Sequence, residues 1–188
     1  MSQTRLILIA APSGAGKNSF MKRALADFPR LLDVVTYTTR PRREGETSGV
    51  DYHFIDKSDF RDRIEKGFFV EWAHVHDSLY GTSRQSLEEA WAQGRVAIMD
   101  IDIQGVEKFS EIYPDSVSIF ILPPSIEELK NRILARDKKA PSNLDLRLSN
   151  AEKEIQQAHR YDYQVVNDDF EASYGRFKKI LEKLLSFE

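Results

Sequence analysis

The sequence predicts an α/β fold, a three-layer sandwich whose mostly parallel central sheet is covered by helices on both faces. Continuous apolar runs recur at residues 5–10, 96–99, 117–122 and 163–166. Continuous rather than alternating apolarity is typical of strands that are buried on both faces. Helical patterns separate these runs, and strands that alternate with helices form parallel sheets through crossover connections.

The composition limits the classes of protein to consider. The chain has 188 residues, of which 41% are hydrophobic and 30% charged, as in a globular domain. It has no cysteine, which excludes disulfides, thiol catalysis and zinc–thiolate sites. The net charge of −3 argues against general nucleic-acid binding, and no apolar run approaches the roughly 20 residues of a membrane span. We therefore expect a cytoplasmic protein without nucleic-acid or membrane partners.

Helices are expected between the strands. Residues 19–26 form a helix-compatible run after the first strand. Residues 83–93 precede Gly94, and glycine is suited to the position after a helix end. The sequence Ser-Ile-Glu-Glu from Ser125 is a capping box that opens a further helix. Residues 170–185 carry apolar residues at helical spacing and are expected to form the last helix.

Two segments interrupt this alternation. Residues 36–80 are rich in arginine, aromatic and turn residues, with strand-like pieces at 52–55 and 68–72 around a short helix at 59–66. We expect a small inserted subdomain there. Residues 125–160 are polar and charged in their second half and are expected to form a helical lid. The rest would form the core of one domain spanning 1–188, in three segments: 1–35, 81–124 and 161–188.

The first strand runs into the sequence APSGAGKNS, residues 11–19. Strand, glycine-containing loop with lysine, and helix are the layout of a phosphate-binding loop, or P-loop. The match to G-x-x-x-x-G-K-[ST] is incomplete, because Ala11 replaces the first glycine and Asn18 replaces the hydroxyl residue. An ordinary strand-to-helix turn is the alternative, and two glycines followed by Lys17 argue against it. The predicted phosphate-binding residues are Ser13, Gly14, Ala15, Gly16, Lys17, Asn18 and Ser19.

The arginine-rich stretch from Thr36 to Tyr52 predicts a second anion site. Arg40, Arg42 and Arg43 cluster there beside hydroxyl and aromatic residues. Arginine binds phosphate oxygens bidentately, and a tyrosine hydroxyl can add another hydrogen bond. The alternative is a solvated charged loop.

Glu71 lies between apolar residues, and Tyr80-Gly-Thr follows it. A carboxylate can accept two N–H bonds from the edge of guanine. Adenine presents an acceptor at the same ring position, so the carboxylate would repel it. The alternative is a glutamate exposed at a sheet edge.

The sequence Asp100-Ile-Asp102 follows an apolar run, at a strand end where Mg²⁺ or its water shell is held opposite a phosphate loop. Strand alternation would put both carboxylates on one side, and helix-capping acids are the alternative reading. Three arginines in the expected lid could clamp a transferring phosphoryl group or serve only for solvation: Arg132, Arg136 and Arg147.

These motifs together resemble the guanylate kinase family, almost from end to end of the chain. The motifs in order are APSGAGK, TTR-x-x-R-x-GE-x-x-G-x-DY, F-x-EWA, YGT, DID-x-QG, PPS-x-E-x-L and VNDD. The resemblance implies transfer of a phosphoryl group from ATP to GMP, with dGMP as a further acceptor, and transfer to GMP gives ADP and GDP in the presence of Mg²⁺. It also implies a core, a GMP-binding subdomain and a lid that closes over ATP. It does not indicate a monomer or a homo-oligomer.

The same resemblance implies roles for individual residues. The GMP phosphate would be held by Arg40, Arg43, Tyr52 and Tyr80. Guanine would be recognised by Thr36, Glu71, Thr82 and Asp102, with Asp100 also on the GMP side. ATP would be bound by the P-loop residues, by Arg132, and by Asn167 near adenine. The catalytic residues would be Lys17, Arg40, Arg136, Arg147 and Asp100. Mg²⁺ would be ordered by Asp100, through water, and by Asn18.

Asn18 is the main departure from the family pattern. The usual hydroxyl ligates Mg²⁺, whereas an amide is longer and its NH₂ group is a poor neighbour for a cation. Our hypothesis is a weakened use of Mg·ATP with GMP binding retained. The alternatives are a guanylate-kinase-like domain that binds GMP or phosphopeptides, and a kinase for another nucleotide or metabolite. Of the two adjacent arginines, Arg43 is favoured over Arg42 by its spacing to Gly45-Glu46.

Overall fold

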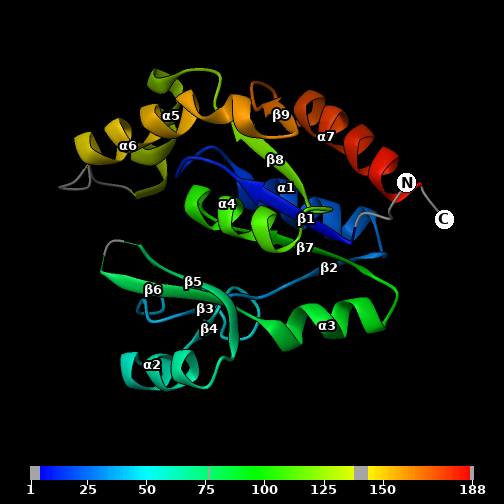
Figure 1. The fold of residues 1–188 in the computed structure, drawn as a ribbon. Coiled ribbons are helices and arrows are strands. Elements are labelled where there is room, and N and C mark those ends of the chain that lie inside the picture. The colour runs from blue at the N-terminus through cyan, green and yellow to red at the C-terminus, as the bar shows by residue number, and fades with distance from the viewer. Residues whose placement is uncertain (1–4, 76, 138–143, 187–188) are drawn as a thin grey trace.

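The structure is a computed structural model that describes residues 5–75, 77–137 and 144–186 (Figure 1). Its larger sheet has five strands in the order β2-β7-β1-β8-β9, and every neighbouring pair is parallel. The predicted parallel central sheet is therefore confirmed. The strands are β1 (Leu6–Ala10), β2 (Leu31–Asp33), β7 (Val96–Asp100), β8 (Val117–Leu122) and β9 (Tyr163–Val166).

Helices cover both faces of this sheet, which confirms the three-layer arrangement. Alternate β1 residues belong to two different cores, with Ile7 packed among residues of α1 and α7, and Leu8 among residues of α3 and α4. Burial on both sides explains why the predicted strands are continuously apolar. The four helices are α1 (Lys17–Asp27), α3 (Arg84–Ala92), α4 (Ile103–Ile112) and α7 (Phe170–Leu185).

A second sheet has four strands in the order β4-β3-β6-β5 and lies with helix α2 below the first in Figure 1. It has its own small core, in which the rings of Phe60 and Phe69 stack at 4.4 Å. The sheet continues to Ser83, three residues past the expected end of the insertion. Its elements are β3 (Tyr37–Thr38), β4 (His53–Phe54), α2 (Lys57–Glu65), β5 (Phe69–Val75) and β6 (Ser78–Ser83).

Helices α5 (Ile126–Asp137) and α6 (Leu144–Gln156) lie over the opposite side of the larger sheet from α2 in Figure 1, and a 3₁₀ helix, η1 (Ala158–Arg160), follows them. The Ser125 hydroxyl accepts the Glu128 N–H at 3.1 Å, which confirms the predicted helix cap. Part of the expected lid, residues 138–143, lies outside the described residues.

Some boundaries differ from the predicted ones for a local reason. Helix α2 begins two residues earlier than expected, because the Asp56 carboxylate caps it by accepting the Asp59 N–H at 2.8 Å. Helix α4 was not expected, and it begins at a cap made by Asp102. Gly94 has φ +68°, as its predicted place after helix α3 requires.

Candidate active site

A cleft of about 610 Å³ opens at the carboxyl ends of β1 and β7. Its walls come from the predicted P-loop, the four-stranded sheet, and helices α5 and α6. The carboxyl ends of parallel strands are the usual place for ligands in such folds. Most of the predicted site residues line this one cleft: Ser13, Gly14, Gly16, Lys17, Asn18, Ser19, Thr36, Arg43, Tyr52, Glu71, Tyr80, Thr82, Asp100, Asp102, Arg132 and Arg147.

The loop between β1 and α1 is shaped by two glycines. Gly14 and Gly16 both have φ +97°, a conformation that residues with a side chain rarely adopt. Gly16 is also the N-cap of α1 and offers no side-chain cap. The first N–H groups of the helix are therefore available to an anion in the cleft, where the helix dipole also favours negative charge.

Lys17 and Asp100 face each other where this loop meets the end of β7. The Lys17 ammonium lies 3.0 Å from the Asp100 carboxylate, and both side chains are partly exposed. Asp33 is close enough to interact electrostatically with both members of this pair. Burial, and then the charge of Asp100, raise the pKa of Asp33 to about 6, while Lys17 opposes the rise. The end of the sheet therefore concentrates carboxylates around one ammonium.

On the opposite side of the cleft, Arg40 is held by Glu46. Its two terminal nitrogens donate to the Glu46 carboxylate at 2.7 and 3.1 Å, and its guanidinium lies 5.3 Å from the centre of the Tyr52 ring. Arg40 does not itself line the cleft, whereas Tyr52 and Tyr80 do. Burial, and then the charge of Asp100, raise the pKa of Tyr52, so its hydroxyl stays protonated as a donor.

Glu71 is buried beside Thr82, its partner in the β5–β6 register. Lys108 on α4 reaches it, with its ammonium 3.3 Å from a carboxylate oxygen of Glu71 and 2.9 Å from the Trp72 carbonyl oxygen. Burial raises the pKa of Glu71, Lys108 opposes that rise, and Asp102 adds to it. The predicted guanine carboxylate is thus a buried group next to one cation.

Asp102 reaches the cleft by a different route from the predicted one. Strand β7 ends at Asp100, so strand alternation does not place Asp102. The Asp102 carboxylate instead accepts the Gly105 N–H at 2.8 Å as the cap of α4. The capping role considered as an alternative is therefore real, and the carboxylate also lines the cleft.

Two residues predicted to bind ATP, Ala15 and Asn167, do not line the cleft, and one predicted catalytic residue, Arg136, is not described in full. Ala15 is fully buried, and Asn167, only 6% exposed, lies behind the loop rather than on the cleft. Arg132 donates to Glu128 at 3.0 Å and to the Asn167 carbonyl oxygen at 3.1 Å. Arg147 faces the cleft from α6. Arg136 belongs to α5, and its side chain lies outside the described part of the structure.

A family model described as guanylate kinase matches residues 3–184. The chain belongs to the guanylate kinase family. A guanylate kinase of Bdellovibrio bacteriovorus is 58% identical over 98% of this chain and 100% of its own length. A guanylate kinase of Syntrophotalea carbinolica is 44% identical over 94% of this chain and 84% of its own length. The crystal structure of a guanylate kinase from Anaplasma phagocytophilum is 33% identical, covering 97% of this chain and 87% of that one, with a TM-score of 0.77.

Membership of the guanylate kinase family leaves further cleft residues to explain. Glu154 on α6 lines the cleft, and burial, then the charge of Asp102, raise its pKa to about 7. It follows Arg147 by seven residues, or two helical turns, so the spacing alone could have indicated a shared face. Two residues behind the cleft lining were also missed as partners of site residues: no local pattern marks Lys108, and Glu46 stands in the family motif without a predicted contact to Arg40. Within the described residues, no helix is both long and apolar enough to cross a membrane.

Proposed function

We propose that the chain transfers the terminal phosphoryl group of ATP to GMP by direct in-line transfer between two nucleotides bound in the cleft. The observation that carries this proposal is that one cleft joins the P-loop to the buried pair Glu71–Thr82. The products are ADP and GDP. Membership of the guanylate kinase family supports the same reaction.

Each side of the cleft suits one nucleotide. The P-loop, with Lys17, would bind the ATP phosphates through main-chain N–H groups and one ammonium. Glu71 would accept two N–H bonds from guanine, and Arg43 with the two tyrosines would face the GMP phosphate. The other site residues keep the roles that the family resemblance implies. Arg40 does not line the cleft and would act on the GMP phosphate from behind Tyr52.

The chemistry requires no covalent intermediate. An oxygen of the GMP phosphate attacks the γ-phosphorus of ATP, and the bond from that phosphorus to the β–γ bridging oxygen breaks. The chain aligns the two nucleotides and offsets their charge. Alignment alone can lower the activation free energy by about 7–11 kcal/mol. Arg132 and Arg147 face the cleft from α5 and α6, where cations would meet the transferring group. Closing these helices over ATP would exclude water.

The donor side of the cleft fits Mg²⁺. This ion takes oxygen ligands, keeps several waters and binds mainly through nucleotide phosphates with one or two carboxylates. In the described part of the chain, no group of three or more side chains could hold a metal by itself. Asp100, through water, and the Asn18 amide oxygen would complete a shell provided by ATP. Bound there, Mg²⁺ would neutralise phosphate charge.

Asn18 is exposed in the first turn of α1 and lines the cleft. We propose that its amide weakens Mg·ATP use without affecting GMP. A cytoplasmic location remains a prediction.

A coupled assay with ATP and Mg²⁺ tests the proposed function. We expect ADP to form with GMP and dGMP, and far more slowly with AMP. Comparable rates with AMP and GMP would contradict the assignment of Glu71 to guanine. Phosphopeptide binding without any turnover would instead favour the interaction-module alternative, which no observation on the structure supports at present.

A further inference from the structure

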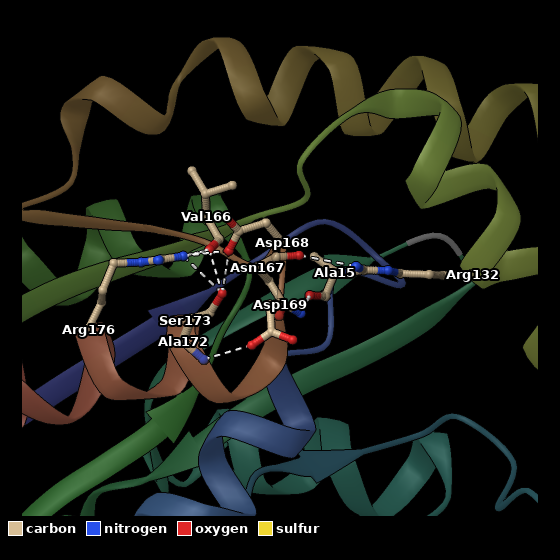
Figure 2. A network of polar contacts seen from close by, with 9 residues as sticks. All are labelled: Ala15, Arg132, Val166, Asn167, Asp168, Asp169, Ala172, Ser173 and Arg176. Atoms are coloured by element: carbon tan, nitrogen blue, oxygen red, sulfur yellow. Dashed lines mark hydrogen bonds and ion pairs between the residues drawn. The ribbon is translucent and has the colours of Figure 1, made fainter.

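Asn167 joins the end of the sheet to the back of the P-loop (Figure 2). Its main-chain N–H donates to the Leu122 carbonyl at 2.7 Å, which continues the β8–β9 pairing by one residue. Its side-chain amide donates to the Ala15 carbonyl at 2.7 Å. Asn167 is 6% exposed and Ala15 fully buried, so neither group has water as a substitute partner.

Gly16 leaves the space that this amide occupies. A Cβ atom on Gly16 would lie 2.5 Å from the Asn167 amide nitrogen, closer than real atoms approach. The glycine therefore serves two needs at once, its positive φ and the passage of the Asn167 side chain.

The bond to Ala15 determines which way a cleft peptide group faces. The peptide from Ala15 to Gly16 is trans, so its C=O and N–H point in opposite directions. Asn167 draws the C=O away from the cleft, and Gly16 lines the cleft on the other side. With this arrangement the Gly16 N–H would face the cleft, where an anion could accept from it. With the peptide reversed, a carbonyl oxygen would face the anion instead.

Asn167 also holds a second part of the cleft. Its carbonyl oxygen accepts a bond from Arg132 at 3.1 Å, and Arg132 is oriented further by Glu128. In Figure 2, Asn167 lies between the loop with Arg132 on one side and Arg176 on the other. Both the loop and one cleft arginine are thus attached to a single buried residue.

The neighbours of Asn167 are fastened to helix α7. The Val166 carbonyl accepts bonds from Ser173 at 2.8 Å and Arg176 at 2.7 Å. The Asp168 carboxylate accepts bonds from the same two side chains at 2.8 and 2.6 Å. The segment that carries Asn167 is therefore held on both sides of that residue, which fixes the position of the backbone from which the amide side chain extends.

We propose that Asn167 is a positioning residue of the donor site, which fixes the Ala15–Gly16 peptide so that the Gly16 N–H faces the donor phosphates. This inference rests on the proposed function, and it replaces the place near adenine that the family resemblance implied for Asn167. Recognition through the loop serves any triphosphate, whereas an adenine contact serves ATP alone. The nature of the donor base therefore separates the two roles.

The test uses Asn167→Ala and Asn167→Asp, the second of which keeps the size of the side chain but loses the donor. Calorimetry measures Kd for ATP, CTP, inorganic tripolyphosphate and GMP. Arg176→Gln is the matched control, because it loosens the same segment without touching the loop. We expect both Asn167 variants to bind ATP, CTP and tripolyphosphate roughly tenfold more weakly, with GMP unchanged within about twofold. Ser173 still holds the segment in this control, so thermal stability should fall while Kd for the triphosphates stays within about twofold of the wild type.

A loss confined to ATP would overturn the proposal in favour of an adenine contact. Equal losses for GMP and the triphosphates, or no loss, would also overturn it. If both variants fail to fold, the wild-type chain still provides a test, because tripolyphosphate should shift the NMR signal of the Gly16 N–H, and no shift would refute the proposal. The proposed function is tested separately by turnover of GMP, which tripolyphosphate binding does not require.

Discussion

The two sides of the cleft differ in whether main-chain groups or side chains face the ligand. The donor side is largely main chain, with two glycines at φ +97° and a loop carbonyl held by Asn167, and the Lys17 side chain adds an ammonium paired with Asp100. The acceptor side is made of side chains, and the structure shows two of them paired with other side chains. Arg40 is bound to Glu46 at 2.7 Å, and Glu71 lies 3.3 Å from Lys108.

This difference suggests how each side meets its ligand. Main-chain donors held by buried bonds need no rearrangement, so the proposed donor site would be preorganised for phosphate. Charged side chains that neutralise one another must share or exchange partners when a nucleotide enters. We therefore expect donor-side substitutions to act on phosphate chemistry and acceptor-side substitutions to act on selectivity.

The largest effect is expected for Lys17→Met on the donor side. The change removes the ammonium that faces Asp100 at the mouth of the loop. We expect kcat/KM for ATP to fall about 10²–10³-fold in steady-state assays, since a preorganised cation is lost. Lys22→Met is the control, on an exposed position of the same helix. A similar loss in the control would mean that the helix, not the ammonium, was affected.

A smaller loss is expected for Glu71→Gln on the acceptor side. The amide keeps the size of the side chain but offers guanine one acceptor instead of two. We expect kcat/KM for GMP to fall roughly 10–100-fold, with Kd for ATP unchanged. Glu65→Gln, an exposed position on α2, is the control. If ATP affinity fell as much as GMP affinity, the division of the cleft into two sides would be wrong.

Asn18→Ser tests whether the donor side lacks one ligand. A serine hydroxyl at this position is shorter than the asparagine amide and offers Mg²⁺ an oxygen ligand without a neighbouring NH₂ group. We expect kcat/KM for Mg·ATP to rise several-fold, up to about tenfold, with the magnesium dependence moving to lower concentration. Asn18→Ala should bring no gain, because it removes the amide without adding a hydroxyl. An unchanged rate in Asn18→Ser would refute a weakened donor site.

The smallest effect is expected for Lys108→Met, and it depends on pH. Burial raises the pKa of Glu71, and loss of the Lys108 ammonium raises it further. A protonated Glu71 turns an O–H toward the N–H donors of guanine, so GMP affinity is lost as pH falls. We expect this loss to begin at higher pH in the variant, with Kd weakened roughly three- to tenfold at the acidic end.

Calorimetry with GMP across pH measures this shift. Lys108→Arg, which keeps the charge, should follow the wild type. The GMP phosphate titrates in the same way with every variant, so it does not contribute to the difference between their pH profiles. Identical profiles for Lys108→Met and Lys108→Arg would show that Lys108 does not control Glu71.

Local patterns predicted the parts of the fold that local physics determines. The last helix begins and ends at the expected residues, 170 and 185, because apolar spacing and the Asp169 cap define it. Strand β2 was not expected, since three residues carry too little pattern and their pairing with β7 makes them a strand. Helix α4 was missed for a similar reason, because its start depends on reading Asp102 as a cap.

The candidate site divides in the same way. Spaced motifs identified Glu71, Asp100 and the P-loop, and the structure brings them to one cleft. Their partners could not be found from spacing. Lys108 lies 37 positions from Glu71, and only the packing of α4 on β5 brings them together. The roles of the individual residues stay predictions for the experiments above.

The bond from Asn167 to Ala15 also has a consequence for how the protein is made. The two residues are 152 positions apart, so a ribosome that has completed the loop must add the whole segment up to residue 167 before the loop gains its anchor. A nascent chain should therefore hold the acceptor sheet before it can bind a donor. Ribosome-bound chains halted before Asn167 emerges should fail to retain tripolyphosphate, and chains from which Asn167 and helix α7 have emerged should retain it. Newly made enzyme would then gain its donor site last.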